Sequence, residues 1–101
     1  MRASFSLYEK SHHARFLGTR HRAKELRADL ENLLDARGEI LIDFTGFEAT
    51  QSFIDEFIGQ LVLYRGDAFI SRVVFHGCSD DVKAIISFVV SDRLAQFRRS
   101  A

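Results

Sequence analysis

One segment in the middle of the chain constrains the fold more than any other. It begins with the continuous apolar run Ile40-Leu41-Ile42, which is typical of a strand buried on both faces in a parallel sheet. Gly46 then marks a turn. From Gln51 to Tyr64 apolar residues recur at helical spacing, which predicts an amphipathic helix that opens on Ser52. A buried strand, a turn and a serine-headed helix indicate an α/β domain.

The flanking sequence continues this alternation of strands and helices. Thr19 is expected to cap a helix with one apolar face, and Ser79 is expected to cap another. Arg37-Gly38 and Arg65-Gly66-Asp67 are expected to end helices. The remaining elements are expected as a strand over 4–8, a loop over 9–18, a helix over 19–36, a strand over 72–76, and a helix from 79 whose tail frays from Arg93.

Length and composition indicate one domain over residues 1–101. The chain is 47% hydrophobic and contains ten Phe, which suffices for a single core. The expected β-α-β-α-β-α order implies parallel strands joined by crossover helices, in a small mixed or parallel sheet flanked by helices. Without a signal peptide, a membrane-length apolar run or a second cysteine to pair with Cys78, the chain is expected to be soluble and cytoplasmic, with no membrane partner.

Charge is balanced in total but uneven along the chain. There are 14 basic and 14 acidic residues, a balance that argues against a dedicated nucleic-acid binder. Residues 1–27 hold seven basic side chains against two acids, whereas residues 28–67 hold nine acids against two arginines. These regions are either ordinary solvated faces or a bipolar surface that docks a charged partner.

The central segment also carries a family resemblance. Asp43-Phe44-Thr45-Gly46-Phe47 followed by Gln51-Ser52-Phe53-Ile54-Asp55-Glu56-Phe57-Ile58-Gly59 resembles the STAS-like domain of unknown function, which is related to the STAS domains of bacterial anti-sigma factor antagonists. Weaker support comes from residues 16–20, 72–75 and 82–86 with Arg93. The resemblance covers roughly residues 3–94, and it implies a mixed sheet flanked by helices.

The resemblance implies a regulatory protein that is not an enzyme and needs no cofactor. Its partner would be a histidine-kinase-like ATPase or an anti-sigma factor, bound through the turn and helix over 47–59. Ser52 matches the serine that such a kinase phosphorylates in anti-sigma antagonists. Gln51, Phe53 and Ile54 depart from the family's Asp-Ser-Ser-Gly. The expected partner-binding residues are Phe47, Glu48, Thr50, Gln51, Ser52, Asp55 and Glu56.

The residues themselves leave two roles open for Ser52. It precedes an apolar helix and has Asp55 three residues later, which approximates a capping box. A phosphoserine at a helix start is also physically reasonable, although Asp55 and Glu56 would repel it. If Ser52 is only a helix cap, the domain would be a structural subunit of a larger assembly and would not be phosphorylated. A homo-oligomer is one form that such an assembly could take. Phe53 is expected to be buried, whereas Phe47 is undecided between core and surface.

Other chemistry has weaker support. Asp43 and Glu48 are considered as a carboxylate pair, and Asp43 with Ser52 as the centre of a small hydrolase or transferase. Cys78 and His76 are considered as a nucleophile and its base, without an orienting third group. His12, His13, His21 and Cys78 match no zinc spacing, so no metal is expected. No phosphate-binding glycine-rich loop is present.

Overall fold

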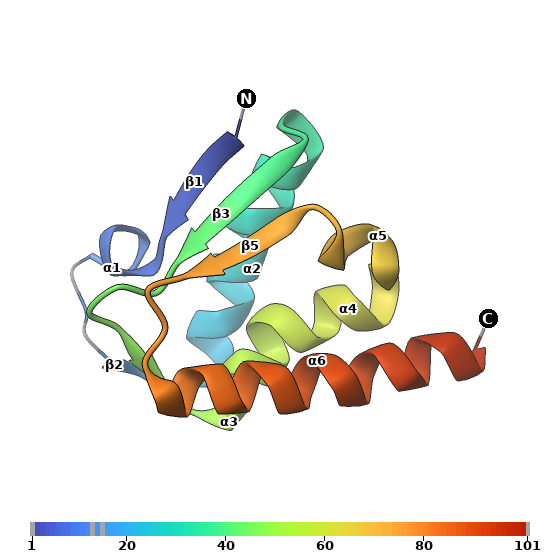
Figure 1. Ribbon diagram of the computed structural model, residues 1–101. Helices are drawn as coiled ribbons and strands as arrows, with labels where there is room; N and C mark the ends of the chain where they lie inside the picture. The colour runs from blue at the N-terminus through green and yellow to red at the C-terminus, as the bar shows by residue number, and fades with distance from the viewer. Residues whose placement is uncertain (1, 13, 15, 101) are drawn as a thin grey trace.

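The main sheet of the protein has three parallel strands. The computed structural model describes residues 2–12, 14 and 16–100. Strands β1 (Arg2–Ser6), β3 (Glu39–Asp43) and β5 (Val73–His76) lie in the order β1-β3-β5 (Figure 1). A second parallel pair joins β2 (Phe16–Leu17) to β4 (Glu48–Ala49). The expected order of the three main strands and their crossovers is confirmed, and the sheet takes the parallel form.

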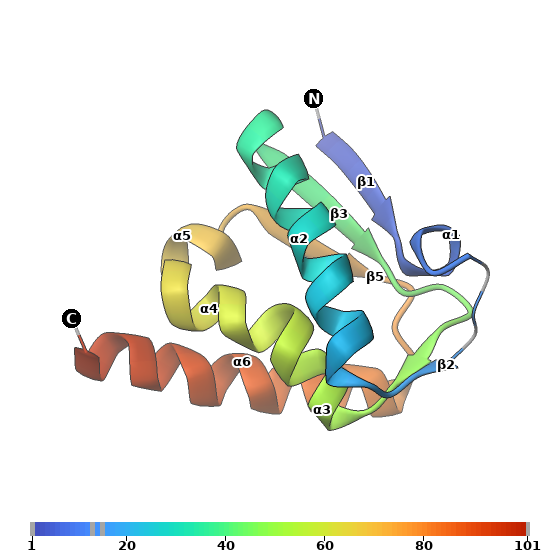
Figure 2. The ribbon, with the colours of Figure 1, turned by 180° about the vertical axis from the view of Figure 1, so that it is seen from behind.

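Two crossover helices cover one face of this sheet. The first is α2 (Arg20–Ala36), between β1 and β3. The second is one continuous helix between β3 and β5, built from α3 (Gln51–Ile54), the π-helical turn η1 (Asp55–Gly59) and α4 (Gln60–Arg65). Figure 2 shows both on the same side of the strands, with α6 (Asp80–Ser100) packed across the second helix rather than on the sheet.

The opposite face of the sheet is not covered by any helix among the residues that the structure describes (Figures 1 and 2). The side chains alternate: Ile40 and Ile42 are fully buried beneath the helices, but Leu41 between them is only half-buried. Leu41 stands in register with Ser4 and with Val74, which is 40% exposed. The prediction that β3 is covered on both faces is therefore wrong for the outer face.

A row of phenylalanine rings fills the space between sheet and helices. Phe53 lies 5.6 Å from Phe57 and 6.1 Å from Phe47, measured between ring centroids. Phe57 in turn lies 5.9 Å from Phe5 of β1. Tilted contacts at these distances are favourable beyond simple burial. These rings connect β1, the β3–β4 turn and the second crossover helix into one core.

Three local predictions differ from the structure. The first strand ends at Ser6, because the Ser6 hydroxyl accepts a hydrogen bond from the Glu9 amide at 3.3 Å and starts the short helix α1 (Leu7–Lys10). The expected loop over 9–18 contains β2. The tail after Arg93 is helical to Ser100, and Phe97 packs on Gly66, where no Cβ would fit. Gly66, with φ of 59°, ends α4 as expected and leads into α5 (Asp67–Ile70).

Gly59 sets how closely α6 approaches η1. A Cβ there would lie 2.7 Å from Asp55 Oδ1 and 3.0 Å from Val89 Cγ1. We expect Gly59→Ala to lower the free energy of unfolding by roughly 1 kcal/mol net. Overpacking costs about 1–3 kcal/mol, and the higher helix propensity of alanine recovers about 1 kcal/mol of that. Urea unfolding measures this loss. The control Gly38→Ala meets nothing within 4 Å, and an equal loss in both variants would contradict the packing argument.

Candidate functional site

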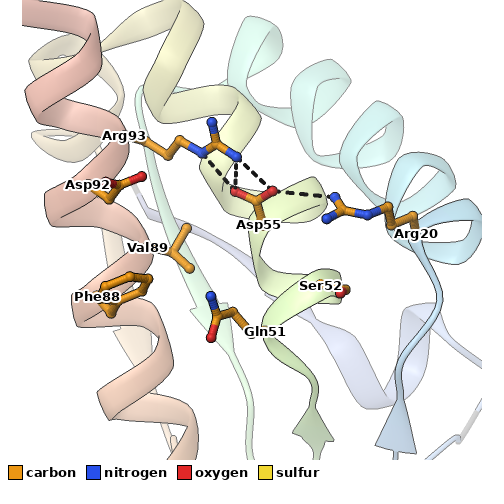
Figure 3. A pocket seen from close by; sticks show the side chains of 8 residues that line it. All are labelled: Arg20, Gln51, Ser52, Asp55, Phe88, Val89, Asp92 and Arg93. Carbon is orange, nitrogen blue, oxygen red and sulfur yellow. Dashed lines mark hydrogen bonds and ion pairs between the residues drawn. The ribbon is translucent and has the colours of Figure 1, made fainter.

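A groove of about 390 Å³ lies between the start of the second crossover helix and the middle of α6. We call it the Ser52 groove. Gln51 and Ser52 of α3 form its floor with Asp55, and Phe88 and Val89 of α6 form one wall (Figure 3). Phe88 is 60% exposed and presents its ring at the edge of the groove. The groove is lined by Arg20, Gln51, Ser52, Asp55, Phe88, Val89, Asp92 and Arg93.

Thr50, not Ser52, caps the helix that forms the floor of the groove. The Thr50 hydroxyl oxygen accepts a hydrogen bond from the Phe53 amide at 3.1 Å and donates to the Gly18 carbonyl oxygen at 3.1 Å. Ser52 is therefore already inside the first turn, and the predicted capping role is wrong for it. Its hydroxyl is exposed and has no hydrogen-bond partner among the described residues.

Asp55 and Glu56 are neutralised by arginines from two other helices. Arg93 of α6 binds Asp55 through both donors of a fork, Nε to Oδ1 at 2.7 Å and a terminal nitrogen to Oδ2 at 2.8 Å (Figure 3). Arg27 of α2 donates to the Glu56 carboxylate at 2.5 Å and to the Glu56 main-chain oxygen at 2.7 Å. Arg20 reaches both carboxylates at 3.3 and 3.5 Å. These ion pairs join α2, η1 and α6.

This arrangement gives the uneven charge distribution a third explanation. The basic first quarter of the chain and its acidic middle bind each other inside one domain, through Arg20, Arg27, Asp55 and Glu56. Neither a simple solvated face nor a bipolar docking surface describes these four side chains. Adjacent residues diverge around an α-helix, yet the π-helical turn leaves Asp55 and Glu56 both in reach of Arg20.

Burial removes two of the expected partner-binding residues from the surface. Phe47 is 1% exposed and packs against Phe44 and Phe53, and Glu56 is 8% exposed. Of the others, Glu48 accepts a hydrogen bond from the Ser79 hydroxyl at 2.9 Å, which links β4 to the start of α6. Thr50 is half-buried in its capping role. Gln51 and Ser52 are exposed and remain predicted contact residues, with Asp55 at the groove floor.

Asp43 is separate from the Ser52 groove. The Asp43 carboxylate, at the end of β3, accepts hydrogen bonds from the Thr45 hydroxyl at 2.6 Å and the Thr45 amide at 2.9 Å. The bond from the Thr45 hydroxyl, and to a lesser extent the bond from the Thr45 amide, hold the pKa of Asp43 below its usual value of 3.8. Asp43 does not line the groove with Ser52, and it makes no bond to Glu48 among the described side chains.

The lowered pKa predicts a small acid-sensitive contribution to stability. A carboxylate with a depressed folded-state pKa stabilises the protein above about pH 4 and loses that contribution as the pH falls through the folded value. We expect Asp43→Asn to remove this contribution, so the two proteins converge in free energy of unfolding below about pH 4. Urea unfolding between pH 6 and pH 2.5 tests this, with the exposed Asp29→Asn as control. A parallel pair of curves would contradict the assignment to Asp43.

Cys78 does not have the environment of a reactive thiol. The pKa of the Cys78 thiol is raised, mainly by burial, although the positive charge of Lys83 counteracts part of this effect. A raised pKa keeps the sulfur protonated and weakens it as a nucleophile. The thiol lies in a smaller cavity of about 210 Å³ beside Phe75, Gly77 and Ile86.

The histidines considered together with Cys78 as metal ligands form no site in the part of the chain that the structure describes. His13 lies outside the described residues, and His12, His21 and Cys78 belong to no metal-binding cluster among the residues that are described.

Sequence reasoning missed five residues of the groove. Arg20 comes from the first turn of α2, and Phe88, Val89, Asp92 and Arg93 come from α6. Phe88 had a detectable signal, because it lies off the apolar face formed by Val82, Ile86 and Val89. The arginines had none, since their partners are 35 and 38 residues away in the chain.

Within the described part of the chain, no helix has both the length and the apolar character needed to cross a membrane.

Neither a curated protein nor a solved structure matches the chain significantly. The model of one protein family does match, and its description is STAS-like domain of unknown function (DUF4325). The match covers residues 22–83, which is more than half of the chain and runs from the first turn of α2 through the second crossover helix. The chain therefore belongs to the family of STAS-like domains of unknown function.

Proposed function

We propose that this protein is a non-enzymatic regulatory module that docks a protein partner over the Ser52 groove. The observation that carries the proposal is the groove itself, where exposed Gln51 and Ser52 lie beside the 60%-exposed ring of Phe88. Exposed aromatic side chains are effective anchors in protein interfaces. The expected partner is a histidine-kinase-like ATPase or an anti-sigma factor, encountered in the cytoplasm, with Gln51, Phe88 and Asp92 as contacts.

In this proposal Ser52 is the switch. The Ser52 oxygen attacks the γ-phosphorus of ATP held by the kinase, the bond to ADP breaks, and the hydroxyl proton passes to a base of the kinase. The phosphoserine then carries about −1.5 to −2 charges on the docking surface. The hydroxyl is exposed and free of partners within the described structure, so no native contact has to break first. A partner that docks on the unphosphorylated surface would be released.

The test uses a purified histidine-kinase-like ATPase as the candidate partner. The two purified proteins are incubated with ATP, and phosphate is mapped by mass spectrometry. We expect phosphate on Ser52 and none after Ser52→Ala. Binding is measured by calorimetry, where Phe88→Ala should weaken the complex at least tenfold and Tyr64→Ala should not. Tyr64 is a matched control, because it is 73% exposed and lies outside the groove. Phosphate elsewhere, or equal effects of the two substitutions, would refute the proposal.

The uncovered face of the sheet favours a second candidate, an assembly subunit. Parallel sheets are almost always covered on both faces, and here the outer face presents Leu41 and the 40%-exposed Val74. A second copy or a larger complex would cover this face. Light scattering distinguishes the candidates: a stable oligomer that Val74→Lys dissociates supports assembly, whereas a monomer supports reversible docking at the Ser52 groove.

A further inference from the structure

The Ser52 groove contains one arginine that the fold does not require. Asp55 already has a two-donor interaction with Arg93, and the Glu56 carboxylate already accepts a short hydrogen bond from one nitrogen of Arg27. The side chains of these two arginines are only 23% and 21% exposed. Each carboxylate is thus paired at short distance without Arg20.

Arg20 makes only weak use of the same carboxylates. Its guanidinium lies 3.3 Å from Asp55 Oδ2 and 3.5 Å from Glu56 Oε1, and its side chain is 53% exposed. Exposed ion pairs of this kind contribute little, because water screens them and the long side chain loses entropy. Moving Arg20 away would therefore cost the fold little.

Ser52 lies where Arg20 can reach it. Both side chains line the groove, and the Ser52 hydroxyl points away from α6 toward the α2 side, from which Arg20 extends (Figure 3). We propose that Arg20 is the receptor for a phosphate on Ser52: the guanidinium leaves Asp55 and Glu56 and binds the phosphate oxygens. This inference rests on the proposed function in taking Ser52 as the modified residue.

The charges around the groove favour this exchange. A guanidinium binds a phosphate through two donors, which is stronger than a long contact to a shared carboxylate. Asp55 and Glu56 keep Arg93 and Arg27, so they do not face the phosphate as bare charges. Asp92 on the α6 wall accepts a hydrogen bond from Gln96 at 2.9 Å. The repulsion expected from Asp55 and Glu56 is thereby relieved, and the fold stays intact.

The experiment needs no kinase. Phosphoserine is incorporated at position 52 during translation, and the second pKa of the phosphate is followed by phosphorus NMR against pH. We expect that pKa to be lower by roughly half a pH unit when Arg20 is present than in Arg20→Gln. Arg22→Gln is the matched control, since Arg22 is in the same turn of α2 but pairs with Glu25 at 3.1 Å and lies outside the groove. Phosphoserine at Ser91, an exposed position on α6, gives the unpaired reference.

Two outcomes would overturn the inference. One is an equal phosphate pKa with arginine or glutamine at position 20. The other is unfolding of the phosphorylated protein, because the exchange leaves the Arg93–Asp55 and Arg27–Glu56 pairs in place. The result is independent of the kinase assay: a kinase that ignores Ser52 refutes the proposed function and leaves the Arg20 measurement valid, whereas a phosphorylated Ser52 with an unshifted pKa refutes only the role of Arg20.

Discussion

Glu56→Ala is expected to lower the free energy of unfolding by about 3 kcal/mol. The substitution leaves the Arg27 guanidinium without its 2.5 Å carboxylate partner at a site where Glu56 is 8% exposed. Breaking a buried ion pair costs about 3–5 kcal/mol. The lower end applies because Arg27 keeps the Glu56 main-chain oxygen and a contact to Glu31 at 3.8 Å.

Urea unfolding measures this effect, and Glu25→Ala is the matched control. Glu25 also pairs with an arginine, Arg22 at 3.1 Å, but its side chain is 51% exposed. Its loss should cost less than about 1 kcal/mol. Similar losses for Glu25→Ala and Glu56→Ala would contradict the view that burial makes the Arg27–Glu56 pair a structural bond between α2 and η1.

Phe53→Ala is expected to cost about 3–5 kcal/mol, because it removes a fully buried ring from the core. The Phe53 ring contacts Phe47 and Phe57, so the cavity would open between the β3–β4 turn and the second crossover helix. The total free energy of unfolding of a protein domain is only about 5–15 kcal/mol. The variant should therefore unfold at a much lower urea concentration than the parent protein.

Phe88→Ala is the control that separates core from surface. Phe88 is a helical phenylalanine like Phe53, but it is 60% exposed on the groove wall. We expect its loss to change the unfolding free energy by less than about 0.5 kcal/mol, as for most surface substitutions. A large loss of stability in Phe88→Ala would mean that the ring is part of the core, and would remove it as an anchor for a partner.

Much of the fold was readable from local patterns. The helix from Thr19 to Ala36, the apolar run of β3 and the helical spacing after Gln51 each produced the expected element. The cap at Thr19 is confirmed by its 3.3 Å bond from the Arg22 amide. Periodicity and capping depend on neighbours in the sequence, so a single chain carries enough information for them.

The start of the serine-headed helix shows where local patterns stop. Thr50 and Ser52 are both good caps, and no rule of spacing separates two hydroxyls placed two residues apart. The Gly18 carbonyl decides between them, because it binds the Thr50 hydroxyl from 32 residues away. Phe47 was likewise undecided until packing against Phe44 and Phe53 placed it in the core.

The sequence alone determined that this chain forms an α/β domain with a strand, a turn and a helix at its centre, because those elements follow from periodicity and turn residues close together in the chain. Only the tertiary structure decided that Ser52 is exposed rather than a cap, and that Arg20, Phe88 and Arg93 share its groove. It also decided that Asp55 and Glu56 bind arginines instead of facing Ser52 as free charges. Long-range ion pairs and packing set these outcomes, and neither leaves a periodic trace in the sequence.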